Sequence, residues 1–125
     1  MKNLEMPHKS VVYWHKRQSL NEIRKQKPMF EQLMAQTRQC MELHPDLAND
    51  ITGAIQCETI HPQTLSGFAN FTFHTHPHNI AYPSQKDIET TKRLHKEYLL
   101  IGLAQQNKVV AFHKDDNYER LVAKF

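Results

Sequence analysis

The chain has 125 residues and a formal net charge of +3, from sixteen Lys and Arg against thirteen Asp and Glu. This length suits one domain with a modest core, and an apolar fraction of 39% separates the sequence from disordered chains. The longest apolar run, residues 99–104, is too short to cross a bilayer, and the first residues lack the apolar stretch of a signal peptide. We therefore expect a single cytoplasmic domain over residues 1–125, without a membrane partner.

The positive charge is too dispersed to indicate a nucleic-acid site. Lys16 and Arg17, with residues 24–27, form the only basic cluster in the sequence. Aromatic residues do not alternate with these positions, as they would in a surface that stacks bases. The pattern favours a solvated helix face over an RNA-binding surface, so nucleic acid is not an expected partner.

The two cysteines, Cys40 and Cys57, do not form the pattern of a disulfide framework or a CxxC motif. They can pair only if the fold brings them together. The favoured expectation is two small buried thiols.

The first part of the chain predicts a strand followed by helices. Residues 9–16 contain a short β-branched and aromatic run, which is typical of an edge strand. Ser19 and Glu22 form a capping-box pattern that predicts a helix beginning near Leu20. Pro28 then either interrupts that helix or starts a second one.

A helical stripe and a loop come next. From residue 30 onward the apolar side chains recur at helical spacing, which predicts one face packed on the core: Phe30, Leu33, Met34, Cys40 and Met41. Residues 43–49 are expected to form a loop that is broken by Pro45.

After this loop the period of the sequence changes to that of strands. Residues 51–59 and 68–76 are predicted strands joined by a turn at 61–67. In the second strand Ala69, Phe71 and Phe73 share one face, and Asn70, Thr72, His74 and His76 share the other.

The remaining sequence predicts one helix and three strands. Residues 77–83 form a loop bracketed by prolines, and Ser84 and Asp87 open a helix that runs to about His95. Strands are expected at 98–104, 108–114 and 119–124. The elements together predict an α/β fold: a single domain with a mainly antiparallel mixed sheet flanked by helices.

The most informative residues surround the proline-bracketed loop. His74 and His76, two places apart on a strand, point the same way and can reach one metal ion. Asp87, in the first turn of the next helix, can supply a third ligand after the chain folds back. Ser84 and Asp87 also form an ordinary helix N-terminus, and each histidine alone is compatible with a strand residue facing solvent. Their combined spacing favours zinc with an open fourth position for water, as in catalytic sites.

This spacing resembles the signature of the JAMM or MPN-plus metallopeptidases: His-Ser/Thr-His, seven residues, Ser, two residues, Asp. Every defined position is matched by His74-Thr75-His76 and Ser84-Gln85-Lys86-Asp87, and Pro77 and Pro83 stand where such proteins commonly carry proline. The order of predicted elements is similar over roughly residues 28–124. The resemblance implies a JAMM-like (cytidine-deaminase-like) fold with its core in that range.

The resemblance also implies a chemistry. His74, His76 and Asp87 are the implied ligands of Zn²⁺, which would lower the pKa of water and polarise the scissile carbonyl. Ser84 is implied to hydrogen-bond the developing oxyanion or to hold the water in place. The implied activity is hydrolysis of a peptide or isopeptide bond at the C-terminal tail of a ubiquitin-like or related small carrier protein.

The general base departs from the family pattern. The family carries Glu-x-x-Gly in its first core strand, and here Asp50 stands three residues before Gly53. Folding residues 50–76 as a simple hairpin about positions 63 and 64 sets Gly53 opposite His74 and leaves Glu58 near residue 69. If the two strands are direct neighbours, this geometry favours Asp50 over Glu58.

An Asp is one methylene shorter than the expected Glu, and a base misplaced by about an ångström costs on the order of a hundredfold in rate. Three alternatives therefore stay open. The chain is an enzyme with Asp50 as its base, an enzyme that uses Glu58 or Glu42, or a non-catalytic or weakly active binding module that retains the metal site.

Overall fold

The computed structural model describes residues 17–49, 55–60 and 69–125. Its four-stranded sheet has the order β1-β2-β3-β4. β1 (Phe71–His76) pairs in parallel with β2 (Tyr98–Leu103), and β3 (Lys108–His113) and β4 (Leu121–Lys124) add antiparallel pairings. The protein is thus a small single α/β domain with a mixed sheet, which confirms the expected fold class at that level.

The helices begin where their capping residues predict. Ser19 and Glu22 form the capping box of α2 (Leu20–Arg24), and Pro28 lies in the first turn of α3 (Lys27–Leu43). Pro28 therefore starts a second helix, because its missing N–H is not needed in a first turn. The expected loop after α3 instead contains a 3₁₀-helix, η1 (Pro45–Asn49).

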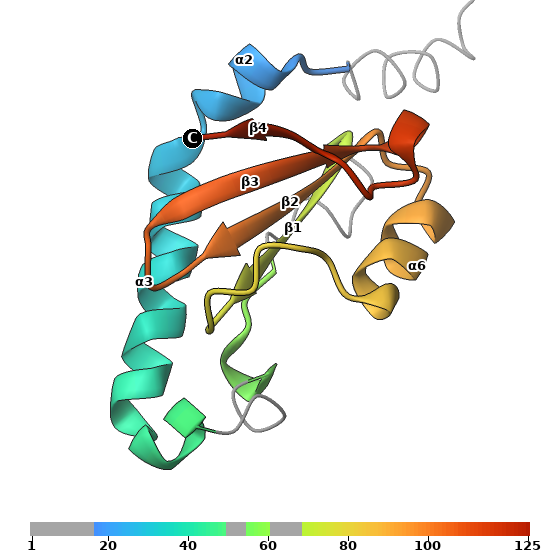
Figure 1. Cartoon of the computed structure of the whole chain (residues 1–125). Coiled ribbons are helices and arrows are strands. Elements are labelled where there is room, and N and C mark those ends of the chain that lie inside the picture. The colour runs from blue at the N-terminus through green and yellow to red at the C-terminus, as the bar shows by residue number, and fades with distance from the viewer. Residues whose placement is uncertain (1–16, 50–54, 61–68) are drawn as a thin grey trace, which may run out of the picture.

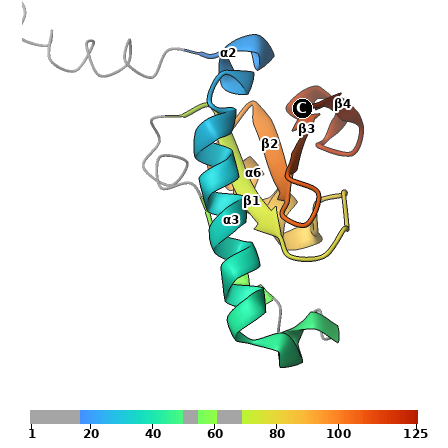
Figure 2. The same ribbon diagram turned by 90° about the vertical axis from the view of Figure 1, so that its left-hand side faces the viewer.

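Two helices cover the two faces of the sheet (Figures 1 and 2). α3 packs its buried Phe30 and Met34 against Phe71 and Phe73 of β1. On the opposite face α6 (Gln85–Arg93) packs beside Leu99, Ile101 and Phe112. The predicted alternation of β1 is confirmed, because its phenylalanines face α3 and its two histidines face α6.

The C-terminal half matches the predicted elements closely. α6 ends at Arg93, slightly before the expected end near His95, which has a positive φ of 55°. A short 3₁₀-helix, η3 (Lys114–Asp116), joins β3 to β4. None of the helices in the described ranges combines the length and hydropathy needed to span a membrane.

In the segment before β1, the described residues 55–59 do not form the strand predicted at 51–59. Residues 55–57 form a 3₁₀-helix, η2 (Ile55–Cys57), and Cys57 is bonded to Cys40 of α3 by a disulfide with a Cα–Cα distance of 5.6 Å. The expectation of two free thiols is therefore wrong. The disulfide to α3 is a tertiary constraint that outweighs the local strand propensity. Local sequence patterns do not predict such a constraint.

The hairpin register expected for residues 50–76 is also wrong. Ile60, not Gly53, forms the antiparallel bridge with His74, and the main partner of β1 is the parallel strand β2. Counting two places back from Ile60 and two forward from His74 sets Glu58 opposite His76. The expected strand at 9–16, the turn at 61–67 and Asp50 lie outside the described residues.

Candidate metal centre

The two histidines of the motif lie at the carboxyl half of β1, and Asp87 faces them from the first turn of α6. All three residues are buried, with relative exposures of 6% for His74, 9% for His76 and 7% for Asp87. Asp87 Oδ2 lies 3.1 Å from His76 Nε2, and Asp87 Oδ1 lies 3.8 Å from His74 Nδ1. One carboxylate therefore contacts both rings.

The position of Asp87 is fixed by the start of its own helix. Ser84 Oγ accepts a hydrogen bond from the Asp87 amide at 3.1 Å, and Asp87 Oδ2 accepts one from the Ser84 amide at 3.1 Å. This is a capping box, so the helix-cap interpretation of Ser84 and Asp87 is confirmed. The cap also aims the Asp87 carboxylate at the histidines, and the two interpretations of the motif therefore describe one arrangement.

His76 has an oxygen at each ring nitrogen. Nδ1 lies 2.8 Å from the carbonyl oxygen of Ile80, which can only accept, so Nδ1 carries the hydrogen. Burial works to lower the pKa of His76, but the hydrogen bonds to Asp87 and Ile80 outweigh it and raise this pKa. In the neutral ring Nε2 presents its lone pair toward Asp87. A backbone carbonyl at the second nitrogen is the usual support of a metal-ligating histidine.

His74 and Asp87 complete the donor set. Burial lowers the pKa of His74, which favours a neutral ring, and His74 Nε2 is buried without a hydrogen-bond partner in the described part of the chain. Burial opposes the charged form of Asp87, but the His76 hydrogen bond and the nearby His74 outweigh it and lower the Asp87 pKa. The set is thus two imidazoles and one carboxylate.

These residue types fit a divalent metal such as zinc, although their atoms are not gathered as a formed site. Within the described ranges, no group of three or more His, Cys, Asp or Glu side chains is already placed to hold a metal ion. Ligand atoms at zinc distances would be about 3.3 Å apart in a tetrahedron. The His76–Asp87 distance of 3.1 Å is close to that value, and the His74–Asp87 distance of 3.8 Å exceeds it. The two distances run to different oxygens of Asp87, and the His74 nitrogen nearer to Asp87 is Nδ1 rather than the unpartnered Nε2.

A cavity of about 340 Å³ opens beside these residues. Its lining is mostly apolar and comprises Glu58, His76, Pro77, His78, Ile80, Tyr82, Pro83 and Ser84. Burial raises the pKa of the half-buried Glu58, and the negative charge of Asp87 adds to this against the opposing effect of His76. A carboxyl group with a raised pKa therefore shares a cavity with a motif histidine.

The structure separates the three candidate bases. Glu58 lies on the wall of the cavity with His76, contrary to the hairpin geometry that set it near residue 69. Glu42 is exposed and lines a different cavity, of about 220 Å³. Asp50 lies outside the described residues. Of the described candidates, only Glu58 lines the same cavity as a motif residue, His76.

Ser84 lines the same cavity and is solvent-exposed. Its oxygen accepts the Asp87 amide, and its hydroxyl hydrogen has no acceptor among the described residues. Sequence reasoning missed the Ile80 carbonyl that orients His76. The four-residue separation from His76 was the available signal, since a chain that turns after Pro77 can bring such a carbonyl back to the ring.

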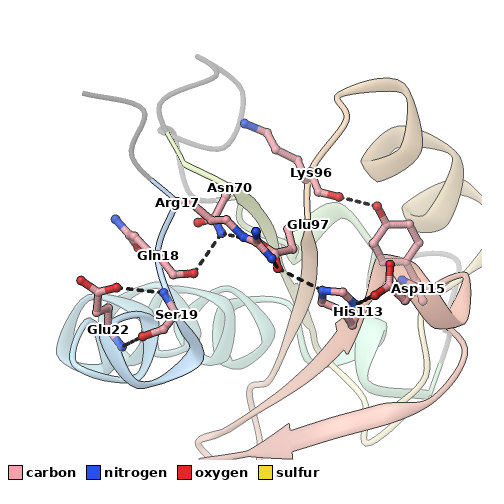
Figure 3. Close-up of polar contacts among 10 residues, drawn as sticks. Arg17, Gln18, Ser19, Glu22, Asn70, Lys96, Glu97, His113 and Asp115 are labelled. Carbon is pink, nitrogen blue, oxygen red and sulfur yellow. Dashed lines mark hydrogen bonds and ion pairs between the residues drawn. The ribbon is translucent and has the colours of Figure 1, made fainter. Parts of the chain in front are cut away.

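A second buried carboxylate, Glu97, lies at the opposite end of β1 and β2 (Figure 3). It accepts hydrogen bonds from Nε and Nη2 of Arg17, from Asn70 Nδ2 at 3.2 Å and from His113 Nε2 at 3.0 Å. The Arg17 hydrogen bonds contribute most to lowering the pKa of Glu97, to about 2. Lys96, the neighbouring residue, is also buried and donates to the carbonyl of Ala69.

No family model matches the chain, and searches of curated proteins and of solved structures returned no significant match.

Proposed function

We propose that this chain is a JAMM-like zinc metallopeptidase that hydrolyses a peptide or isopeptide bond at the C-terminal tail of a ubiquitin-like or related small carrier protein. The supporting observation is the contact of one carboxylate, Asp87, with two buried histidines beside a cavity lined by Glu58 and Ser84. His74, His76 and Asp87 would hold the metal. When bound, it supplies a water of lowered pKa and a polarised scissile carbonyl.

Glu58 is the general base in this proposal. It accepts the proton of the attacking water and passes it to the leaving amine. Burial raises the pKa of Glu58, which makes its carboxylate a stronger base than a fully solvated one. Asp50 stays an alternative base, because it lies outside the described residues.

Ser84 and the cavity wall act on the substrate. The Ser84 hydroxyl donates its free hydrogen to the oxygen that gains charge as water attacks the carbonyl. Ile80 and Tyr82 are 47% and 59% exposed at the cavity, so they offer an apolar surface to an incoming protein tail. Covering this surface removes water from around the reacting groups and strengthens their electrostatic interactions.

A non-catalytic or weakly active binding module that retains the metal site is the second candidate. The 3.8 Å separation of His74 from Asp87 favours it, because this ligand pair is wider than a zinc tetrahedron requires. A cytoplasmic location remains part of the proposal. In that compartment thiols are mostly kept reduced, so Cys40–Cys57 would be a redox-sensitive bond there.

The first experiment measures zinc per chain by elemental analysis, in the parent and in His74→Ala/His76→Ala. The proposal expects about one zinc in the parent and none in the variant. If the zinc-supplied parent holds no more than the variant, the metallopeptidase proposal is wrong.

The second experiment separates the enzyme from the binding module. Ubiquitin with a fluorogenic amide on its C-terminal glycine serves as the substrate for the parent, Glu58→Gln and Glu42→Gln. Glu58→Gln should keep its zinc and lose at least about a hundredfold in kcat. Glu42→Gln, at the other cavity, is the matched control and should cleave like the parent. A parent that binds zinc and ubiquitin without turnover would support the binding module.

A further inference from the structure

The segment that carries Glu58 lies outside the four-stranded sheet, yet the residues on both sides of Glu58 are held by buried contacts. Cys57 is bonded to Cys40 of α3, and Thr59 bridges to β1 through backbone and side-chain hydrogen bonds. Glu58 itself reaches the cavity beside His76. A fixed backbone on either side therefore sets where the carboxyl group lies.

Thr75 makes the contact to the residue after Glu58. Its amide donates to the Thr59 carbonyl at 3.0 Å, and its hydroxyl oxygen accepts the Thr59 amide at 2.7 Å. Thr75 lies between the two motif histidines, and its side chain turns toward α3, where it meets Thr37 at an Oγ1–Oγ1 distance of 2.6 Å. Its relative exposure is 0%, so water does not replace a lost partner there.

The direction of these hydrogen bonds follows from the number of hydrogens available. Thr37 donates its single hydroxyl hydrogen to the carbonyl of Cys57 at 2.8 Å. In the contact between the two hydroxyls, Thr75 must then be the donor. The result is a continuous series from the Thr59 amide through Thr75 and Thr37 to the Cys57 carbonyl. It begins and ends on the two residues that flank Glu58.

We propose that Thr75, acting through Thr37, is a positioning residue that holds the Glu58 carboxyl group beside His76. The inference rests on the proposed function, in which Glu58 is the general base. Valine at position 75 has nearly the shape of threonine but can neither accept the Thr59 amide nor donate to Thr37. Serine retains both abilities. Comparing Thr75→Val with Thr75→Ser therefore separates the effect of losing the hydroxyl group from the effect of changing the side-chain volume.

The first test measures amide hydrogen exchange at Thr59 by NMR in the zinc-supplied full chain. Thr75→Val should speed exchange at Thr59 by about tenfold, the equivalent of one buried hydrogen bond, and Thr75→Ser should leave it close to the parent value. Thr72→Val is the matched control. It removes another buried hydroxyl of β1, one that pairs with Thr91 at 2.7 Å, and it should leave Thr59 protected.

The second test measures hydrolysis of the fluorogenic ubiquitin amide. Thr75→Val should lower kcat by about a hundredfold with KM and zinc content unchanged, because only the base is displaced, and Thr75→Ser should restore kcat. Unchanged Thr59 exchange in Thr75→Val overturns the proposal, and so does parent-like kcat where Glu58→Gln is impaired. If Thr75→Val fails to fold, Thr37→Val takes its place and should lower kcat in the same way.

The experiments distinguish a wrong general base in the proposed function from a wrong positioning role of Thr75. If Glu58→Gln cleaves as fast as the parent, the base of the proposed function is wrong, and the positioning role in catalysis falls with it. The exchange of the Thr59 amide still decides whether Thr75 holds the segment, because that measurement does not depend on turnover.

Discussion

The two ends of β1 and β2 each hold a buried carboxylate beside histidine, but they differ in how the polar atoms are satisfied. At the amino end, Glu97 accepts from Arg17, Asn70 and His113. At the carboxyl end, Asp87 meets two rings, of which His74 retains a buried nitrogen without a partner in the described part of the chain. Both oxygens of the Glu97 carboxylate are therefore hydrogen-bonded, although Asn70 Oδ1 beside it is also buried without a partner among the described residues. The Asp87 carboxylate differs in that it is shared between two histidine rings.

The way in which each carboxylate is bound indicates a different role for it: stabilising the fold for Glu97, and binding a ligand for Asp87. A carboxylate whose acceptor sites are filled by cations and amides stabilises the fold and has no capacity left for a ligand. Asp87, by contrast, contacts two imidazole rings, and two imidazoles with one carboxylate are a donor set that suits a divalent metal. We expect the Glu97 cluster to stabilise the fold and, under the proposed function, the Asp87 cluster to hold the metal, and substitutions at each end can test this expectation.

The largest expected effect is the loss of zinc from Asp87→Asn. The neutral amide removes the anionic ligand, so zinc affinity should fall by more than the roughly hundredfold that a supporting residue costs. The amide oxygen can still accept from the Ser84 amide, so α6 keeps its cap. Competition with a chromogenic chelator measures the affinity. Glu97→Gln is the matched control at the other end, and equal zinc affinity in the two variants would contradict this expectation.

The second-largest expected effect is a loss of stability when the Cys40–Cys57 disulfide, which holds the Glu58 segment, is removed. Replacing both Cys40 and Cys57 by Ala opens a link between residues 17 positions apart. The free energy of unfolding should fall by about 3 kcal/mol, because the unfolded chain regains the freedom of that loop. Urea unfolding measures the change, and the parent treated with dithiothreitol should match the double variant. An unchanged midpoint in both would show that the link does not stabilise the fold.

The meeting of His74, His76 and Asp87 could be predicted because its geometry is local. The two-residue period of a strand puts His74 and His76 on one face, and the Ser84–Asp87 spacing is a helix start whose carboxylate turns back toward the strand. These features need only the neighbouring residues. The sequence alone therefore indicated which side chains meet at the carboxyl end of β1.

The location of Glu58, the base in the proposed function, could not be predicted in the same way. Placing Glu58 requires the register of a segment that is fixed by Thr75 and by a disulfide to α3. The assumption that sequence neighbours form a hairpin failed because β1 takes its main partner from beyond α6. The Glu97 cluster was missed for a related reason, since Arg17, Asn70 and His113 are far apart in the sequence and meet only in the folded sheet.

A smaller effect is expected from Glu97→Gln, which should lower the free energy of unfolding by about 2 kcal/mol. The amide cannot accept hydrogen bonds at both of its terminal atoms, so Arg17 or His113 loses a charged acceptor. Zinc content should equal that of the parent, because this cluster lies at the other end of the strands. Urea unfolding and elemental analysis measure the two quantities. Loss of zinc without loss of stability would reverse the roles inferred for the two clusters.

The smallest effect is a pH dependence that belongs to Glu97. Its pKa is about 2 in the folded protein, below the ordinary value of 4.5, because of the Arg17, His113 and Asn70 hydrogen bonds. Between these two values the unfolded chain binds more protons, so the stabilisation is present above pH 4.5 and is lost as the pH falls toward about 2. At about pH 4 the loss should be about 1 kcal/mol relative to neutral pH.

Comparing the parent with Glu97→Gln isolates this contribution. Asp87 also has a lowered pKa and shifts stability in the same direction, but it does so in both proteins and cancels in their difference. The difference in unfolding free energy, from urea titrations at neutral pH and at about pH 4, should therefore shrink by about 1 kcal/mol. A difference that stays constant over this range would mean that Glu97 is not held ionised by its partners. The stabilising role inferred for the Glu97 cluster would then be wrong.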